Sequence, residues 1–169
     1  MKIILFDLGD TLESQGNIIE GAENTISSIK GMHDSDGESV AISLVSNFDD
    51  FDNNRRRLED VKPKQLEYYR ILKKLGIAKY FEPLYEHVTL SVEIGVRKPD
   101  ERIFRAAIDL IKPGLSFSNV LFVTEEPTHI VAARQMGMKA IQFTPSSQAS
   151  GDSISTLTEL IPKVEEFLG

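Results

Sequence analysis

Four short apolar runs constrain the fold more than any other feature of this 169-residue sequence. They are rich in β-branched residues and do not alternate regularly with polar ones, which is the pattern of strands buried on both faces. The runs are IILF from Ile3, VAISLV from Val40, NVLFV from Asn119 and KAIQF from Lys139. They predict the strands of a mainly parallel sheet, and HVTL from His87 predicts a further short strand.

Helical patterns alternate with these runs. Apolar residues recur at helical spacing, and glycines or a Pro-Asp pair mark several helix ends. The predicted helices cover residues 20–30, 64–75, 99–111, 128–137 and 154–168. The stretch TPSSQASGDS from Thr144 is expected to connect flexibly to the last helix. Strands that alternate with helices predict right-handed crossovers, and so a three-layer α/β/α sandwich with a Rossmann-like sheet.

Length and composition limit the class of protein. A chain of 169 residues, 41% of them hydrophobic, can bury one sizeable core, so residues 1–169 are expected to form a single domain. A net charge of −7 argues against nucleic-acid binding and against an anionic membrane surface. The absence of cysteine excludes a thiol nucleophile and a thiolate zinc site. The N-terminal apolar run is too short for a signal peptide or a membrane span, which favours a cytoplasmic protein.

Polar residues suited to catalysis follow three of the predicted strands. Asp7 ends the first run, Ser46 ends the second, and Glu125 follows the run from Asn119. In parallel sheets, functional residues gather at the carboxyl ends of the strands. Together with Lys98, at the start of a predicted helix, these residues form one candidate site.

The segments that carry these residues resemble, in order and spacing, the haloacid dehalogenase (HAD) superfamily over nearly the whole chain. They are ILFDLGDTL ending at Leu12, LVSN from Leu44, GVRKPDERIF from Gly95 and LFVTEEPTH from Leu121. The first three are specific in combination, whereas the fourth is degenerate. The resemblance implies a HAD-like fold and a Mg²⁺-dependent phosphatase, with a phosphorylated small molecule or macromolecule as its substrate.

The resemblance also implies how the phosphoryl group would be transferred. Asp7 would attack phosphorus and form an aspartyl-phosphate, which splits hydrolysis into two displacements. Ser46 and the backbone at Asn47 would donate hydrogen bonds to the phosphoryl oxygens. Lys98 would neutralise negative charge on Asp7 and on the phosphoryl group.

A magnesium site is implied at the same place. Mg²⁺ would be held by Asp7, Glu125 and the main-chain carbonyl of Gly9, since this ion prefers oxygen ligands. The two carboxylates, Mg²⁺ and Lys98 together leave about one positive charge for a phosphate, so phosphate binding is expected to survive better than catalysis.

The sequence departs from the family pattern at several positions. Gly9 stands where most phosphatases of the family have the aspartate that protonates the leaving oxygen. Asp10, one place along, could turn inward as a replacement acid or cap the turn, and we favour the cap. Thr124 and Glu125 replace the usual Gly-Asp pair, and His129 occupies the position of a later acid. If His129 protonates near its ordinary pKa of about 6.5, metal binding should weaken at lower pH.

Two readings of these departures stay open. In the first, the protein is a phosphatase that hydrolyses aryl or acyl phosphates far better than alkyl phosphates, because good leaving groups depart without an acid. In the second, it is a catalytically impaired HAD-like protein that binds a phospho-ligand or a protein partner without efficient turnover.

No large cap domain is expected over the site. The segments from Leu12 to Ser46 and from Asn47 to Lys98 have room for little more than a helix and a strand each. The resemblance then suggests a large substrate, or a partner or second subunit that closes the open cleft. The arginine run 55–57 could recognise an acidic partner, but the acidic residues around it favour a solvated helix face.

Overall fold

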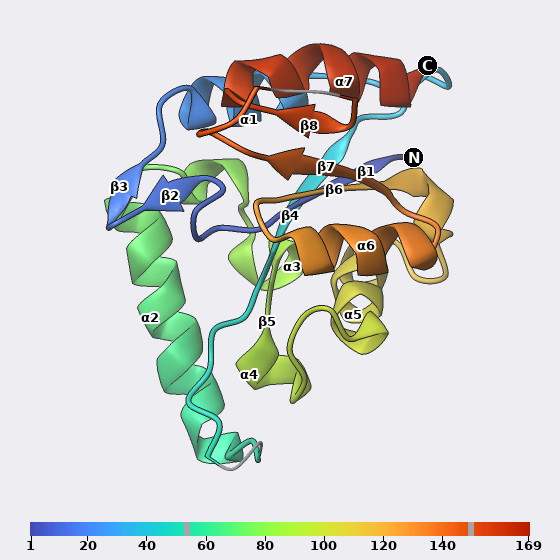
Figure 1. The fold of residues 1–169 in the computed structure, drawn as a ribbon. Helices are drawn as coiled ribbons and strands as arrows, with labels where there is room; N and C mark the ends of the chain where they lie inside the picture. Colours follow the sequence, from blue (N-terminus) through green and yellow to red (C-terminus); the bar gives the residue numbers. More distant parts are fainter. Residues whose placement is uncertain (53–54, 149–150) are drawn as a thin grey trace.

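The computed structural model describes residues 1–52, 55–148 and 151–169. Within them, six strands form one parallel sheet in the order β5-β4-β1-β6-β7-β8 (Figure 1). The strands are β1 Ile3–Phe6, β4 Ala41–Ser46, β5 Val88–Leu90, β6 Val120–Thr124, β7 Lys139–Phe143 and β8 Ser153–Ile154. The predicted parallel sheet is confirmed, and β1 lies at its centre between β4 and β6.

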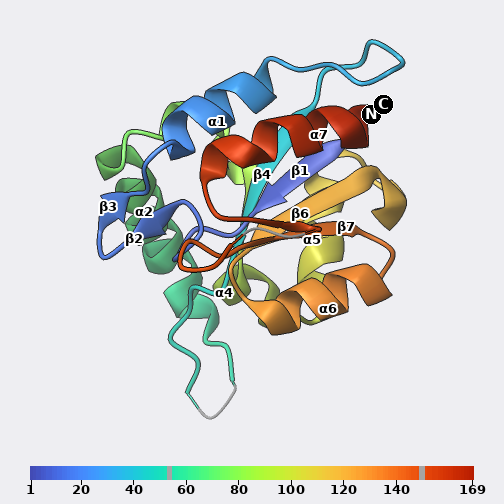
Figure 2. The ribbon, with the colours of Figure 1, turned by 45° about the horizontal axis from the view of Figure 1, so that its top comes forward.

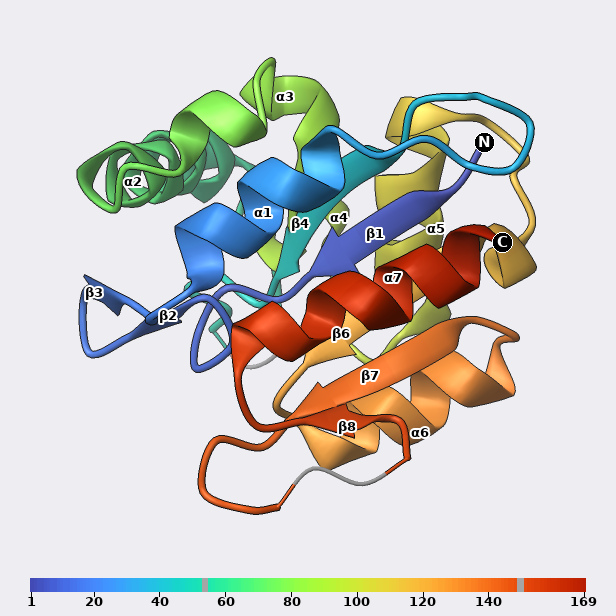
Figure 3. The ribbon, with the colours of Figure 1, turned by 90° about the horizontal axis from the view of Figure 1, so that it is seen from above.

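Helices cover both faces of the sheet, as the strand pattern predicts. Alternate residues of β1 point to opposite faces, so Ile4 and Phe6 join one apolar cluster and Ile3 and Leu5 join the other. The first cluster is completed by α1 Ala22–Lys30, α2 Val61–Lys74 and α7 Leu160–Leu168, and the second by α5 Glu101–Ile111 and α6 Pro127–Gln135. Figures 2 and 3 show α1 and α7 on one side of the sheet and α5 and α6 on the other.

The end of the chain differs from the prediction. Ile154 was expected to open the last helix, but it lies in β8 opposite Phe143, and α7 begins only at Leu160. Ile154 is fully buried, as its apolar character predicts, but its backbone is extended and not helical. Ser153, from the connection expected to be flexible, also lies in β8; residues 149–150 of that connection lie outside the described part.

Short elements frame the carboxyl end of β1. Strands β2 Glu13–Ser14 and β3 Asn17–Ile18 form an antiparallel hairpin, and Figure 1 shows it beside the upper end of α2. Two short helices, α3 Leu84–His87 and α4 Ser91–Ile94, flank β5. These insertions agree with the predicted absence of a large cap.

The arginine run 55–57 precedes the 3₁₀ turn Leu58–Asp60 and therefore does not form the expected helix face. Arg57 pairs with Asp52, and Arg56 donates a hydrogen bond to the carbonyl of Glu93. Among the described residues, no helix combines the length and apolarity that a bilayer crossing requires.

Candidate functional site

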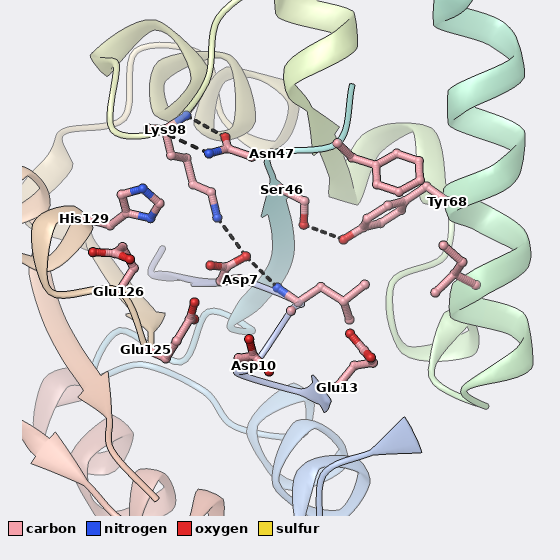
Figure 4. Close-up of a pocket in the computed structure, with 14 residues that line it drawn as sticks. Asp7, Asp10, Glu13, Ser46, Asn47, Tyr68, Lys98, Glu125, Glu126 and His129 are labelled. Atoms are coloured by element: carbon pink, nitrogen blue, oxygen red, sulfur yellow. Dashed lines mark hydrogen bonds and ion pairs between the residues drawn. The ribbon is translucent and has the colours of Figure 1, made fainter. Parts of the chain in front are cut away.

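A cavity of about 370 Å³ lies at the carboxyl ends of β1, β4 and β6 (Figure 4). Its volume is in the range typical of small-molecule sites. Each residue predicted for the site lines it: Asp7, Gly9, Asp10, Ser46, Asn47, Lys98 and Glu125. The lining also contains residues that the sequence did not assign to the site: Leu8, Glu13, Phe48, Tyr68, Ile71 and Glu126.

Asp7 follows β1 directly, and its carboxylate is held from several directions. Oδ1 accepts a hydrogen bond from the Leu8 N–H at 2.8 Å and lies 2.8 Å from Nζ of Lys98. Oδ2 accepts a hydrogen bond from the Thr124 hydroxyl at 3.0 Å. Because Lys98 and Thr124 belong to distant segments, Asp7 does more than cap its own turn.

Asn47 holds the backbone of Lys98 rather than only presenting its own N–H. Its Oδ1 accepts a hydrogen bond from the Lys98 N–H at 2.7 Å, and its Nδ2 donates to the Lys98 carbonyl at 3.3 Å. Burial lowers the pKa of Lys98, and the negative charges of Asp7 and Glu125 oppose that shift. The side chain of Asn47 thus positions the cation that faces Asp7.

Ser46 lies at the end of β4, and its hydroxyl is 2.6 Å from the hydroxyl of Tyr68 on α2. Both side chains are buried. Burial raises the pKa of Tyr68, so the phenol keeps its proton and can donate it to Ser46. Sequence reasoning assigned Tyr68 only to the apolar face of a helix and missed this contact, because helical spacing indicates burial and not a polar partner.

Two carboxylates meet at one hydroxyl beside the end of β6. Oγ1 of Thr124 lies 3.0 Å from Oδ2 of Asp7 and 3.2 Å from Oε2 of Glu125. The same Oε2 accepts a hydrogen bond from Thr11 at 2.7 Å. Thr124, which replaces the usual glycine, therefore links the two predicted metal ligands.

The carboxylate oxygens of Asp7 and Glu125 are ligands of the type that Mg²⁺ binds. Mg²⁺ is usually bound through one or two carboxylates and keeps several waters, and Asp7 and Glu125 supply two carboxylates within reach of one hydroxyl. The described residues contain no group of three or more His, Asp or Glu side chains arranged as a metal site. That the Gly9 carbonyl is a metal ligand stays a prediction.

Asp10 takes the conformation expected of a turn residue. Its φ of 53° lies in the left-handed region, which Asp tolerates better than most residues. Its Oδ1 accepts a hydrogen bond from the hydroxyl of Ser14 at 3.0 Å, and the side chain is exposed at the cavity rim. These contacts favour the capping role over the catalytic role of Asp10.

His129 lies on α6 and lines the cavity on the side across from Asp10 (Figure 4). Its Nδ1 is buried and has no hydrogen-bond partner among the described residues. Burial, and then the charge of Lys98, lower the pKa of His129 below its ordinary value of 6.5. The imidazole is therefore neutral near pH 7, and an effect on metal binding is expected at a lower pH than the sequence suggested.

Comparison with known proteins identifies the fold. No family model matches the sequence. A HAD phosphatase from Thermococcus onnurineus superimposes with a TM-score of 0.65 at 13% identity, over 97% of this chain and 98% of that one. The chain has the HAD-like fold. The resemblance drawn from the four motifs is thus confirmed at the level of the fold.

Two larger HAD proteins match the same fold. YfnB from Bacillus subtilis, assigned to the HAD hydrolases and bound to magnesium, gives a TM-score of 0.60 at 17% identity over 88% of this chain. A HAD family hydrolase from Deinococcus radiodurans with bound phosphate and sodium gives 0.57 at 16% identity over 89%. The present chain spans 57% of the first protein and 60% of the second.

The charges in this HAD-like cavity differ from those expected. Besides the carboxylates of Asp7 and Glu125, those of Asp10, Glu13 and Glu126 line the cavity. Among the lining residues that the structure describes, Lys98 is the one lysine or arginine. The net charge of the cavity, which was expected to be positive, is therefore negative even when Mg²⁺ is counted. Without a metal ion, a phosphate would be repelled strongly.

Proposed function

We propose that this protein is a Mg²⁺-dependent phosphatase of the HAD superfamily that hydrolyses phosphoric monoesters. The observation that carries the proposal is the buried ion pair between Asp7 and Lys98 in the cavity lining, 2.8 Å apart, with Ser46 and Glu125 in the same lining. A fixed carboxylate beside a buried cation is the arrangement that nucleophilic attack on a phosphate requires.

Each residue then has a chemical task. Asp7 attacks phosphorus and forms an aspartyl-phosphate, and water later releases phosphate and regenerates the carboxylate. Ser46, with its hydroxyl supported by Tyr68, donates a hydrogen bond to a phosphoryl oxygen. Lys98, held by Asn47, offsets the negative charge that gathers between Asp7 and phosphorus.

Asp7 and Glu125 would hold the magnesium ion. When bound, Mg²⁺ would supply positive charge toward the phosphoryl oxygens. The excess of carboxylates in the lining supports this requirement, because Lys98 alone cannot balance both the cavity and a phosphate dianion. The HAD proteins found with magnesium or with phosphate also support the assignment.

The test is a set of phosphate esters assayed with Mg²⁺ and with EDTA, for the native protein and for Asp7→Asn. We expect turnover of an aryl phosphate that EDTA abolishes, added Mg²⁺ restores and Asp7→Asn removes, while circular dichroism shows an unchanged fold. Turnover that survives EDTA or Asp7→Asn would contradict the mechanism. Saturable binding of a phosphate mimic without turnover would instead support the alternative of an impaired HAD-like protein that only binds.

The leaving group should matter strongly. Gly9 carries no acid, so aryl and acyl phosphates are expected to react far faster than alkyl phosphates, whose departing oxygen must take a proton from a group placed less directly than the usual acid. Equal rates on matched aryl and alkyl esters would contradict this expectation.

A further inference from the structure

The missing acid leaves open space at Gly9. Apart from its two chain neighbours, a Cβ atom added to Gly9 would meet no atom of the described residues within 4 Å, and the φ of Gly9 lies outside the left-handed region that disfavours side chains. Gly9 lines the cavity directly after the Asp7-Leu8 pair. The position that carries the usual acid is therefore open in this cavity.

Glu13 is held directly beside this gap. The N–H of Glu13 donates to the Leu8 carbonyl at 3.0 Å, and the Glu13 carbonyl accepts from the Asp10 N–H at 2.6 Å. These two bonds flank Gly9 and make Gly9 and Glu13 partners in a β-bridge. The side chain of Glu13 thus starts next to the vacant position, and it lines the same cavity.

The carboxylate of Glu13 is oriented but not saturated. Its Oε1 accepts a hydrogen bond from the Gly16 N–H at 2.5 Å, while its Oε2 has no partner among the described residues. The Glu13 carboxylate and the Ser46 hydroxyl thus belong to the lining of one cavity.

The other titratable side chains of the lining are less suitable. Glu126 caps α6 by accepting hydrogen bonds from the N–H and hydroxyl of Thr128, which lower its pKa. The hydroxyl of Tyr68 is buried and bound to Ser46. Asp10 has one oxygen held by Ser14, and its side chain is exposed at the cavity rim.

We propose that Glu13 supplies the proton that Gly9 cannot, a role that rests on the proposed phosphatase function. As Asp7 attacks phosphorus and the bond to the leaving oxygen breaks, protonated Glu13 gives its proton to that oxygen, which leaves as an alcohol. Glu13, now a carboxylate, takes a proton from water as the water oxygen bonds to phosphorus. The bond from phosphorus to Asp7 breaks, which releases phosphate and leaves Glu13 protonated for the next cycle.

The test compares Glu13→Gln with the matched neighbour variant Asp10→Asn on an alkyl and an aryl phosphate. Gln keeps the oxygen that accepts from Gly16, so the hairpin is retained. We expect Glu13→Gln to lower kcat/KM for the alkyl ester by about 10²-fold and to leave the aryl ester nearly unchanged. Asp10→Asn should shift both esters by the same factor, and adding Gly9→Asp to Glu13→Gln should restore alkyl turnover.

Each other result overturns the proposal. An equal loss on both esters in Glu13→Gln would indicate a structural role, and a selective alkyl loss in Asp10→Asn would assign the proton to Asp10. Native turnover of the aryl ester without any alkyl turnover would refute the role of Glu13 while the phosphatase function stands. Absence of aryl turnover in the native protein would refute both.

Discussion

Nζ of Lys98 lies 2.8 Å from Oδ1 of Asp7, and both side chains are almost entirely withdrawn from solvent. A buried charge is tolerated because its partner compensates it. Removing one partner therefore destabilises the fold by more than the net stabilisation that the ion pair provides. The same contact that would prepare Asp7 for attack therefore also contributes to the stability of the fold.

Replacing Lys98 and replacing Asp7 should lower the free energy of unfolding by different amounts. Lys98→Met leaves Asp7 facing the other carboxylates of the lining without a cation, and we expect a loss of about 3–5 kcal/mol in the free energy of unfolding. Asp7→Asn should cost less, because Glu125 still faces the ammonium. Urea unfolding of both single variants and the double variant measures this. A larger cost for Asp7→Asn, or losses that simply add, would contradict the prediction.

Restoring the family acid should increase activity. Gly9→Asp meets no steric obstacle among the described residues, and in the Glu13→Gln background we expect it to raise kcat/KM for alkyl phosphates by up to about 10²-fold, with a much smaller effect on aryl phosphates. Gly9→Asn has nearly the same size without the acid and is the matched control. A gain shared by Asn and Asp, or no gain at all, would show that proton transfer does not limit alkyl turnover.

The hydroxyl of Tyr68 should matter for phosphate binding. Tyr68→Phe removes the group 2.6 Å from the Ser46 hydroxyl, and we expect vanadate, a phosphate mimic, to bind about 5- to 10-fold more weakly in the presence of Mg²⁺. Tyr69→Phe is the control, since the Tyr69 hydroxyl has no hydrogen-bond partner among the described residues. Titration of vanadate into both variants tests this, and equal affinities would refute the role of Tyr68.

Stability should fall on mild acidification because of His129. Its pKa is lowered in the folded protein, so between that pKa and the ordinary 6.5 the unfolded chain binds more protons. The His129 contribution is therefore fully present above pH 6.5 and is lost as the pH falls below it. Urea unfolding in EDTA at pH 7.5 and 5.5 should show a smaller drop for His129→Asn than for the native protein. The exposed His33 gives the control variant, His33→Asn, whose drop should match the native one.

The sequence was sufficient to predict the layers of the fold and the edge of the sheet at which the candidate site residues lie together. Each apolar run, such as IILF from Ile3, indicates a strand buried on both faces, because a strand covered by helices needs apolar side chains at every position. The convergence of Asp7, Ser46 and Glu125 followed from topology, since parallel strands bring their carboxyl ends to one edge. The same reasoning failed at Ile154, where apolar spacing indicated burial without indicating whether the backbone was helical or extended.

Only the tertiary structure decided which side chains contact one another within that edge. The contact of Tyr68 with Ser46, the Asn47 side chain around Lys98 and the position of Glu13 beside Gly9 all depend on distances between segments. The sequence determined burial and chain order, because both are set by local composition and connectivity. It could not determine these hydrogen bonds, because they form only after packing fixes each segment to within a few tenths of an ångström.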